Sequence, residues 1–243
     1  QHAAKLFRKA QSLQNGGSTR WAAFHFSSMD NPFLSKAALS EISNDMTDLA
    51  YRMEILAEDI DEAPGALWTR KIIDDNRVDP GVQNDRLIVA VDPSTTSTGN
   101  EAGIIACGKT RDTGYVLEDL SMQGSPLTWA RAAVEGYHRL KADSIVAEKN
   151  QGGEMVEITI KQVDPNVNVK LVHASRGKAT RAEPVSAKSE KGLIKFAGKF
   201  GALEDELSLW TPGDPSPNRL DAMVWGMTEL LIGASFMDGC DMS

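Results

Sequence analysis

The stretch Leu87-Ile-Val-Ala-Val-Asp92 is a continuous apolar run that ends in a carboxylate. Such a run is typical of a strand that other elements cover on both faces, because a strand with one solvated face alternates apolar and polar residues. A carboxylate at the end of a buried strand is costly to remove from water unless something compensates its charge. The stretch therefore predicts an α/β sheet with a functional group at the end of one strand.

Two further acids occupy comparable positions. Glu148 ends the run Ser144-Ile-Val-Ala-Glu148, and Asp221 lies near the start of the last helical segment. Each acid alone has an ordinary alternative as part of a turn, a solvated loop or a first helical turn. Together they indicate that one positively charged group balances the charge of all three carboxylates. A pair of hard divalent cations is the natural candidate, because such ions prefer oxygen ligands. We therefore predict that Asp92, Glu148 and Asp221 are the catalytic and metal-binding residues of a site that cleaves phosphate esters.

The order of elements indicates the fold. Three consecutive strands precede an alternation of helices and strands, which predicts a mixed sheet with helices on its faces. This is the order of the ribonuclease H fold, so we predict an α/β, ribonuclease H-like domain with a five-stranded mixed sheet. The expected strands cover 87–91, 102–107, 115–122, 144–147 and 167–172, with a candidate short strand at 193–196, and the expected helices cover 125–140, 153–163, 178–192, 203–209 and 218–232.

Residues 1–84 differ from this pattern and predict a small, mostly helical segment. Apolar residues at helical spacing indicate a helix through Ile42 and Met53, and the aromatic stretch that begins at Trp21 indicates a short strand and a turn. Asp79-Pro-Gly81 marks a turn or linker. We therefore expect two parts, residues 1–84 and residues 85–243.

The formal net charge of -8 argues against a chain whose whole surface coats nucleic acid, but a local basic groove is compatible with an acidic total. The two cysteines, Cys107 and Cys240, match no metal site or disulfide framework, which favours a cytosolic protein. No apolar run approaches the ~18 residues of a membrane span. The most basic local stretch is a candidate DNA-facing strip, or else a solvated helix face, and consists of Arg176, Lys178, Arg181, Lys188 and Lys191.

Four motifs occur in order along the chain, namely Val89-Ala-Val-Asp92-Pro-Ser, Ile145-Val-Ala-Glu148-Lys-Asn-Gln-Gly-Gly153, Lys178-Ala-Thr-Arg181-Ala-Glu-Pro184 and Ser216-Pro-Asn-Arg-Leu-Asp221-Ala. Together they resemble the nuclease domain of the large terminase subunit of tailed bacteriophages. The resemblance covers about residues 86–236, and residues 21–68 are more loosely similar to the end of the terminase ATPase domain.

The resemblance implies an endonuclease of a viral genome-packaging motor that cuts concatemeric double-stranded DNA in the host cytoplasm. It implies two Mg²⁺ or Mn²⁺ ions at Asp92, Glu148 and Asp221, the terminase small subunit and the portal protein as partners, and a ring oligomer during packaging. The sequence has no Gly-x-x-x-x-Gly-Lys-Ser/Thr loop, so we expect no ATPase site and a C-terminal portion of a longer chain. Some relatives have an extra acid near Thr98, where this chain has only Glu101 just beyond.

Three other functions stay open at this point. A Holliday-junction resolvase or a ribonuclease H-type nuclease would share the fold and the acids. The stretch Asp92-Pro-Ser-Thr-Thr-Ser-Thr is also similar to the phosphate-binding hairpin of actin-like phosphotransferases. A non-catalytic scaffold of a packaging motor is the third alternative.

Overall fold

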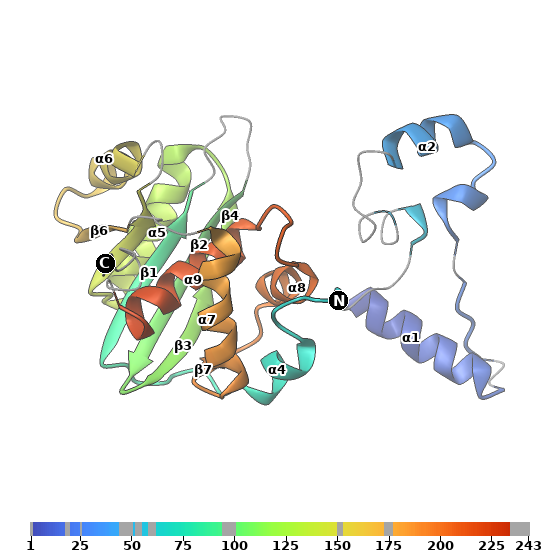
Figure 1. Ribbon diagram of the computed structural model, residues 1–243, viewed down its shortest axis with the longest axis horizontal. Coiled ribbons are helices and arrows are strands. Elements are labelled where there is room, and N and C mark those ends of the chain that lie inside the picture. Colours follow the sequence, from blue (N-terminus) through green and yellow to red (C-terminus); the bar gives the residue numbers. More distant parts are fainter. Residues whose placement is uncertain are drawn as a thin grey trace, which may run out of the picture. The chain divides into compact units, whose positions relative to one another are not determined.

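The computed structural model describes residues 2–17, 20–24, 26–43, 51, 55–57, 62–93, 101–149, 153–172 and 177–233. The chain forms two compact units, residues 1–63 and residues 64–243 (Figure 1).

The first unit contains α1 (His2–Asn15), the short 3-10 helix η1 (Ser28–Asp30) and α2 (Lys36–Ser43). Its helical character agrees with the prediction, although α1 was not foreseen and the predicted helix toward Met53 runs into residues outside the described part. The predicted strand at Trp21 is wrong, since residues 21–24 are irregular. Aromatic residues favour a strand, but a strand is stable only when a neighbouring strand pairs with its backbone.

The second unit is built on a mixed sheet with the strand order β6-β5-β1-β2-β3-β7, and β4 pairs with β2. The pairs β1–β2 and β2–β3 are antiparallel, whereas β1–β5, β5–β6 and β3–β7 are parallel. The strands are β1 (Arg86–Asp92), β2 (Glu101–Thr110), β3 (Thr113–Asp119), β4 (Met122–Gln123), β5 (Ser144–Glu148), β6 (Val169–Val172) and β7 (Ile194–Phe196).

The ribonuclease H-like mixed sheet is therefore confirmed. Within the described residues it has seven strands and not the predicted five. The two additional strands are β7, which matches the candidate short strand at 193–196, and β4, which has only two residues and is too short to give an apolar pattern of its own. Six helices accompany the sheet in the described residues, namely α4 (Arg70–Asp75), α5 (Pro126–Leu140), α6 (Gly153–Val163), α7 (Lys178–Glu190), α8 (Gly201–Leu209) and α9 (Asn218–Leu231).

The side chains of β1 point alternately into two apolar clusters, one on each face of the sheet. Ile88 packs in a cluster with side chains of α4, α7, α8 and α9. Val89 and Val91 pack in a second cluster with side chains of α5 and α6. Helices thus cover both faces of β1, as its continuous apolar run predicts (Figure 1).

Residues 64–84 belong to the second unit and not to the first. Trp68 and Ile73 are fully buried in the cluster that contains α7, α8 and α9. The Trp68 indole Nε1 also donates a hydrogen bond to Ser189 Oγ at 3.0 Å. The structure therefore divides the chain at residue 63, whereas the sequence suggests a boundary at residue 84. That residues 1–84 form the end of an ATPase domain stays a prediction.

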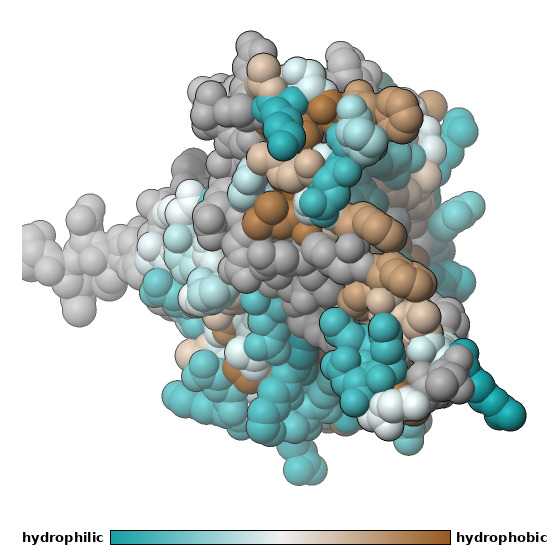
Figure 2. Space-filling view, turned by 90° about the vertical axis from the view of Figure 1, so that its right-hand side faces the viewer, coloured by the Kyte–Doolittle hydropathy of each residue, from teal (hydrophilic) through white to brown (hydrophobic). Residues whose placement is uncertain are grey.

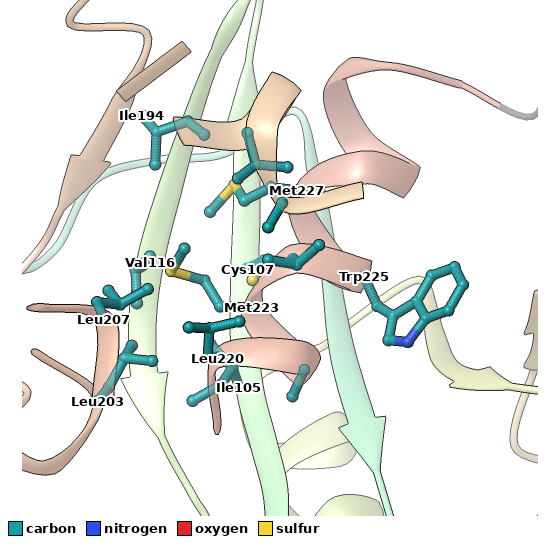
Figure 3. Close-up of a cluster of buried hydrophobic side chains, with 14 of the residues drawn as sticks. Ile105, Cys107, Val116, Ile194, Leu203, Leu207, Leu220, Met223, Trp225 and Met227 are labelled. Atoms are coloured by element: carbon teal, nitrogen blue, oxygen red, sulfur yellow. The ribbon is translucent and has the colours of Figure 1, made fainter. Parts of the chain in front are cut away.

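Helix α9 lies against the sheet along most of its length. Its residues Leu220, Met223 and Met227 face Ile105 and Cys107 of β2 in the apolar cluster (Figure 3). Every residue from Leu220 to Leu230 is buried. A helix that is covered all round places any polar residue it carries inside the protein.

Figure 2 shows hydrophobic patches among hydrophilic residues on one face of the molecule. None of the described helices is both long and apolar enough to cross a membrane.

Candidate active site

The three predicted acids lie at one edge of the sheet. Asp92 is the last residue of β1 and Glu148 is the last residue of β5. These strands are parallel neighbours, with Val91 paired with Ala147, so both carboxylates lie at the same strand ends. All three acids are buried, with exposed fractions of 9% for Asp92, 5% for Glu148 and 3% for Asp221.

The first turn of α9 brings Asp221 to this edge. Asp92 is paired with Gly103 of β2 in the antiparallel ladder. Gly103 has the backbone of Asn218 directly over its Cα, because a Cβ added there would lie 2.0 Å from the Asn218 carbonyl oxygen. The helix that carries Asp221 therefore begins on top of the strand position next to Asp92. The positive end of the helix dipole also favours a carboxylate in this turn.

The electrostatics of Asp92 show that the three carboxylates act on one another. The pKa of Asp92 is raised to about 7, mainly by burial and also by the negative charges of Asp221 and Glu148, although Lys178 and Arg181 act in the opposite direction. Clustered carboxylates in a dry environment disfavour each other's ionised form. Residues far apart in the sequence thus share one electrostatic environment.

Two cations from the start of α7 pair with two of the acids. The Lys178 Nζ donates to Asp221 Oδ2, and Ser216 Oγ donates to the same oxygen. The Arg181 guanidinium donates through Nη1 to Glu148 Oε1 at 3.1 Å. These two cations supply part of the positive charge that the buried acids need.

The donor chemistry of the site fits a divalent cation. Asp92, Glu148 and Asp221 offer only carboxylate oxygens, which hard cations such as Mg²⁺ and Mn²⁺ prefer. The raised pKa of Asp92 indicates that the two internal cations leave its charge incompletely balanced. Within the described residues, no three His, Cys, Asp or Glu side chains stand ready to hold an ion in their present positions. An ion that binds Asp221 through Oδ2 has to displace the Lys178 ammonium.

The predicted basic strip does not lie on one surface. The Lys178 side chain is 46% exposed at the site, whereas that of Arg181 is only 6% exposed. Arg181 therefore does not fit its predicted role in DNA binding, because Glu148 and the ring of Trp225 enclose its guanidinium. Lys188 is partly exposed in the last turn of α7, roughly 15 Å along the helix from Lys178. Arg176 lies outside the described residues.

Trp225 is a residue of the site that the sequence pattern alone does not indicate. Its Nε1 donates to Glu148 Oε2 at 3.3 Å, and the Arg181 Cζ lies 4.1 Å from its ring centroid. In Figure 3 its side chain points away from the other labelled side chains of the apolar cluster. The available signal was its position four residues after Asp221, which places both on one face of a helix.

Glu101, the acid that follows Thr98 in the sequence, pairs with an arginine of α9. Glu101 forms an ion pair with Arg219, which also contacts Asp119 Oδ2 at 2.9 Å and Glu206 Oε1 at 3.0 Å. The second oxygen of Glu206 accepts a hydrogen bond from the backbone N–H of Leu220 at 3.1 Å. These contacts fix the first turn of α9, next to Asp221. Thr98 lies outside the described residues.

Comparison with known proteins identifies the family. The sequence model of the terminase RNaseH-like domain matches residues 89–229, which is more than half of the chain. The chain belongs to this family. The predicted resemblance to the large terminase nuclease domain is therefore confirmed. The matched range includes Asp92, Glu148 and Asp221.

Solved structures of terminases have the same fold. The large terminase from a thermophilic bacteriophage is 14% identical, with a TM-score of 0.54, over 86% of this chain and 56% of that one. The large terminase nuclease from the thermophilic phage G20c is 10% identical, with a TM-score of 0.51, over 69% of this chain and 100% of that one. No curated protein sequence matches. The terminase RNaseH-like chain described here thus spans just over half the length of the first of these two terminases.

Proposed function

We propose that this terminase RNaseH-like domain is a metal-dependent endonuclease that cuts concatemeric double-stranded DNA during viral genome packaging. The observation that carries the proposal is the meeting of Asp92, Glu148 and Asp221 at one edge of a ribonuclease H-like sheet. Family membership supports the same reading, because these acids lie inside the range that the family model matches.

The residues of the site have distinct roles in this proposal. Asp92, Glu148 and Asp221 hold two Mg²⁺ or Mn²⁺ ions. When bound, a pair of such ions supplies an activated water and neutralises the charge on the leaving oxygen. Burial of the three carboxylates keeps bulk water from competing for them. Lys178 is the half-exposed cation at the site. When a metal ion replaces its ammonium at Asp221, the freed ammonium attracts the DNA phosphate.

The biological setting belongs to the proposal as well. As part of a large terminase, the chain would act with double-stranded DNA, the terminase small subunit and the portal protein, in a ring oligomer and in the host cytoplasm. We place ATP hydrolysis outside this chain, because its sequence has no Gly-x-x-x-x-Gly-Lys-Ser/Thr phosphate loop.

A plasmid-nicking assay tests the activity. The parent protein is incubated with supercoiled plasmid and Mg²⁺, Mn²⁺, Ca²⁺ or EDTA, beside Asp92→Asn and the control Asp112→Asn. Asp112 is an exposed residue of the β2–β3 turn, at the opposite end of the strands from Asp92. We expect the parent and Asp112→Asn to cut with Mg²⁺ or Mn²⁺, and no cutting in EDTA or by Asp92→Asn. Cutting that survives both EDTA and Asp92→Asn would refute the proposal.

Other substrates separate the alternatives. Preferred cleavage of four-way junctions or RNA–DNA hybrids over plain duplex would favour a resolvase or a ribonuclease H-type enzyme. Binding of ATP by this chain would favour an actin-like phosphotransferase. An inactive parent under all ion conditions would favour a scaffold.

A further inference from the structure

We propose that Arg181 and Trp225 are positioning residues that fix the carboxylate of Glu148 for cation binding. The inference rests on the proposed function, because it assigns a role to residues around the same site. It also replaces the DNA-binding role that the sequence suggested for Arg181.

Each oxygen of Glu148 has its own donor. The Arg181 Nη1 donates to Oε1 at 3.1 Å, and the Trp225 Nε1 donates to Oε2 at 3.3 Å. The two donors come from different helices, α7 and α9, and the Glu148 side chain is buried between them. Two donors on two oxygens define the plane of a carboxylate, whereas one donor leaves it free to rotate. The remaining lone pairs of Glu148 are therefore aimed in a fixed direction.

Trp225 holds Arg181 as well as Glu148. The Arg181 Cζ lies 4.1 Å from the Trp225 ring centroid, a distance at which a guanidinium and an aromatic face attract each other. One indole thus supplies its ring face to Arg181 and its N–H to Glu148. Arg181, Trp225 and Glu148 form a closed set of three mutual contacts.

Arg181, Trp225 and Glu148 contribute little to the stability of the fold for the free energy needed to bury their polar groups. A buried ion pair contributes little net stability compared with apolar side chains of similar volume. The Arg181 Nε is also buried without a hydrogen-bond partner in the part of the chain that the structure describes. An unsatisfied buried donor costs free energy. Stability therefore does not account for the burial of Arg181, whereas its effect on the orientation of the Glu148 carboxylate does.

Lys178 provides a matched contrast on the same helix. It is also a cation paired with a site acid, three residues before Arg181, but its side chain is half exposed and ends in a flexible ammonium. Arg181 differs from it in being buried and stacked on Trp225. If charge alone mattered, removal of either cation would raise the affinity for a divalent cation by removing repulsion. If Arg181 positions Glu148, its removal lowers the affinity.

Calorimetric titration with Mn²⁺ alone, without DNA, measures the affinity for the cation in variants that lack either Lys178 or Arg181. We expect Arg181→Met to weaken Mn²⁺ binding about tenfold or more, as is usual when the partner of a metal ligand is removed. Arg181→Lys should restore only part of the affinity, because an ammonium lacks the planar fork and stacks less well. Lys178→Met should bind Mn²⁺ as tightly as the parent or more tightly. Folded Arg181→Met with unchanged or tighter binding would overturn the positioning role.

A second comparison shows whether Arg181 acts through Glu148. In the Glu148→Gln background, Arg181→Met should cause no further loss of Mn²⁺ affinity, and a further tenfold loss would contradict the inference. Trp225→Phe keeps the ring beside Arg181 and removes only the N–H, and we expect about a threefold loss of affinity. This variant decides the matter if Arg181→Met does not fold, because unchanged affinity would then count against the inference.

Failure of the inference differs from failure of the proposed function. A parent protein that binds no Mn²⁺ would overturn both. A parent that binds Mn²⁺ and cuts plasmid, beside an Arg181→Met variant that binds equally well, would overturn only the positioning role.

Discussion

Gly103 of β2 lies directly beneath the carbonyl oxygen of Asn218, the first residue of α9. A methyl group at Gly103 would lie 2.0 Å from this oxygen and 2.8 Å from the Arg219 nitrogen. Both are backbone atoms, which cannot rotate away as a side chain can. Because Gly103 is also paired with Asp92, this close approach sets the separation of Asp92 from the helix that carries Asp221.

Gly103→Ala should therefore displace the start of α9. We expect a loss of about 2–3 kcal/mol in the free energy of unfolding, since the new methyl group overpacks a filled space. Mn²⁺ binding should fall as well, because Asp221 moves relative to Asp92. Chemical denaturation and calorimetric titration measure the two effects.

Gly177→Ala is the matched control for this prediction. A Cβ at Gly177 meets nothing within 4 Å, and the backbone φ of -58° suits any residue. We expect its stability to change by less than about 1 kcal/mol. Equal effects of the two substitutions would show that the contact between Gly103 and Asn218 is not what holds α9 in place.

The raised pKa of Asp92 predicts a pH dependence of stability in the ion-free protein. Its pKa is about 7 when folded, against 3.8 for an unperturbed side chain, so the folded state binds the proton more tightly. The protonated form therefore stabilises the fold at low pH, and this contribution is lost as the pH rises from about 4 to about 7.

Asp92→Asn removes this titration, because an amide stays neutral. In EDTA the variant should match the parent near pH 4 and exceed its unfolding free energy by on the order of 2–4 kcal/mol at pH 8. Denaturant unfolding at both pH values checks this. A variant that is no more stable than the parent at pH 8 would mean that ionisation of Asp92 does not lower the free energy of unfolding.

Divalent cations should stabilise the parent protein by binding only its folded state. At an Mn²⁺ concentration about 100 times the dissociation constant, the gain is about 3 kcal/mol. Asp221→Asn should lose most of this gain, whereas the exposed control Asp112→Asn should keep it. Thermal unfolding with and without EDTA measures the effect, and an equal gain in the Asp221→Asn variant would place the ion elsewhere.

The sequence predicts the sheet and the location of the acids because both follow from local patterns. A continuous apolar run indicates a strand covered on both faces, and Ile88 and Val89 indeed pack in different clusters. An acid at the end of such a run lies at the edge of the sheet. The proximity of Asp92 and Glu148 is not visible in the sequence around either residue, because it results from the parallel pairing of β1 with β5.

The environment of Arg181 was not predictable in this way. Its partners Glu148 and Trp225 are 33 and 44 positions away in the sequence (181 − 148 and 225 − 181). An arginine among other basic residues therefore suggests an exposed strip, although the fold buries it. The same reason applies to Trp68, whose indole N–H reaches Ser189 across 121 positions and draws residues 64–84 into the second unit.

Arg219 should stabilise the second unit far more than a surface arginine does. Its side chain is 12% exposed and contacts the carboxylates of Glu101, Asp119 and Glu206. Glu206 is partly buried, and burial raises its pKa while the hydrogen bond from Arg219 lowers it, so the loss of Arg219 would leave this carboxylate without its cation. Removal of one partner from a fully buried set of charges costs about 3–5 kcal/mol, because the others are left unpaired, and for this partly buried set we expect a loss on the order of 2–3 kcal/mol.

Arg139→Ala is the comparison for Arg219→Ala. Arg139 makes a two-pronged contact with Glu118, but its side chain is 54% exposed, and exposed pairs contribute less than about 1 kcal/mol. Denaturant unfolding at pH 7 should therefore show a large loss for Arg219→Ala and a small one for Arg139→Ala. The loss in Arg219→Ala should be accompanied by weaker Mn²⁺ binding, since the first turn of α9 carries Asp221. Similar losses in both variants would indicate that solvent screens the Arg219 cluster and that other contacts hold Asp221 at the site.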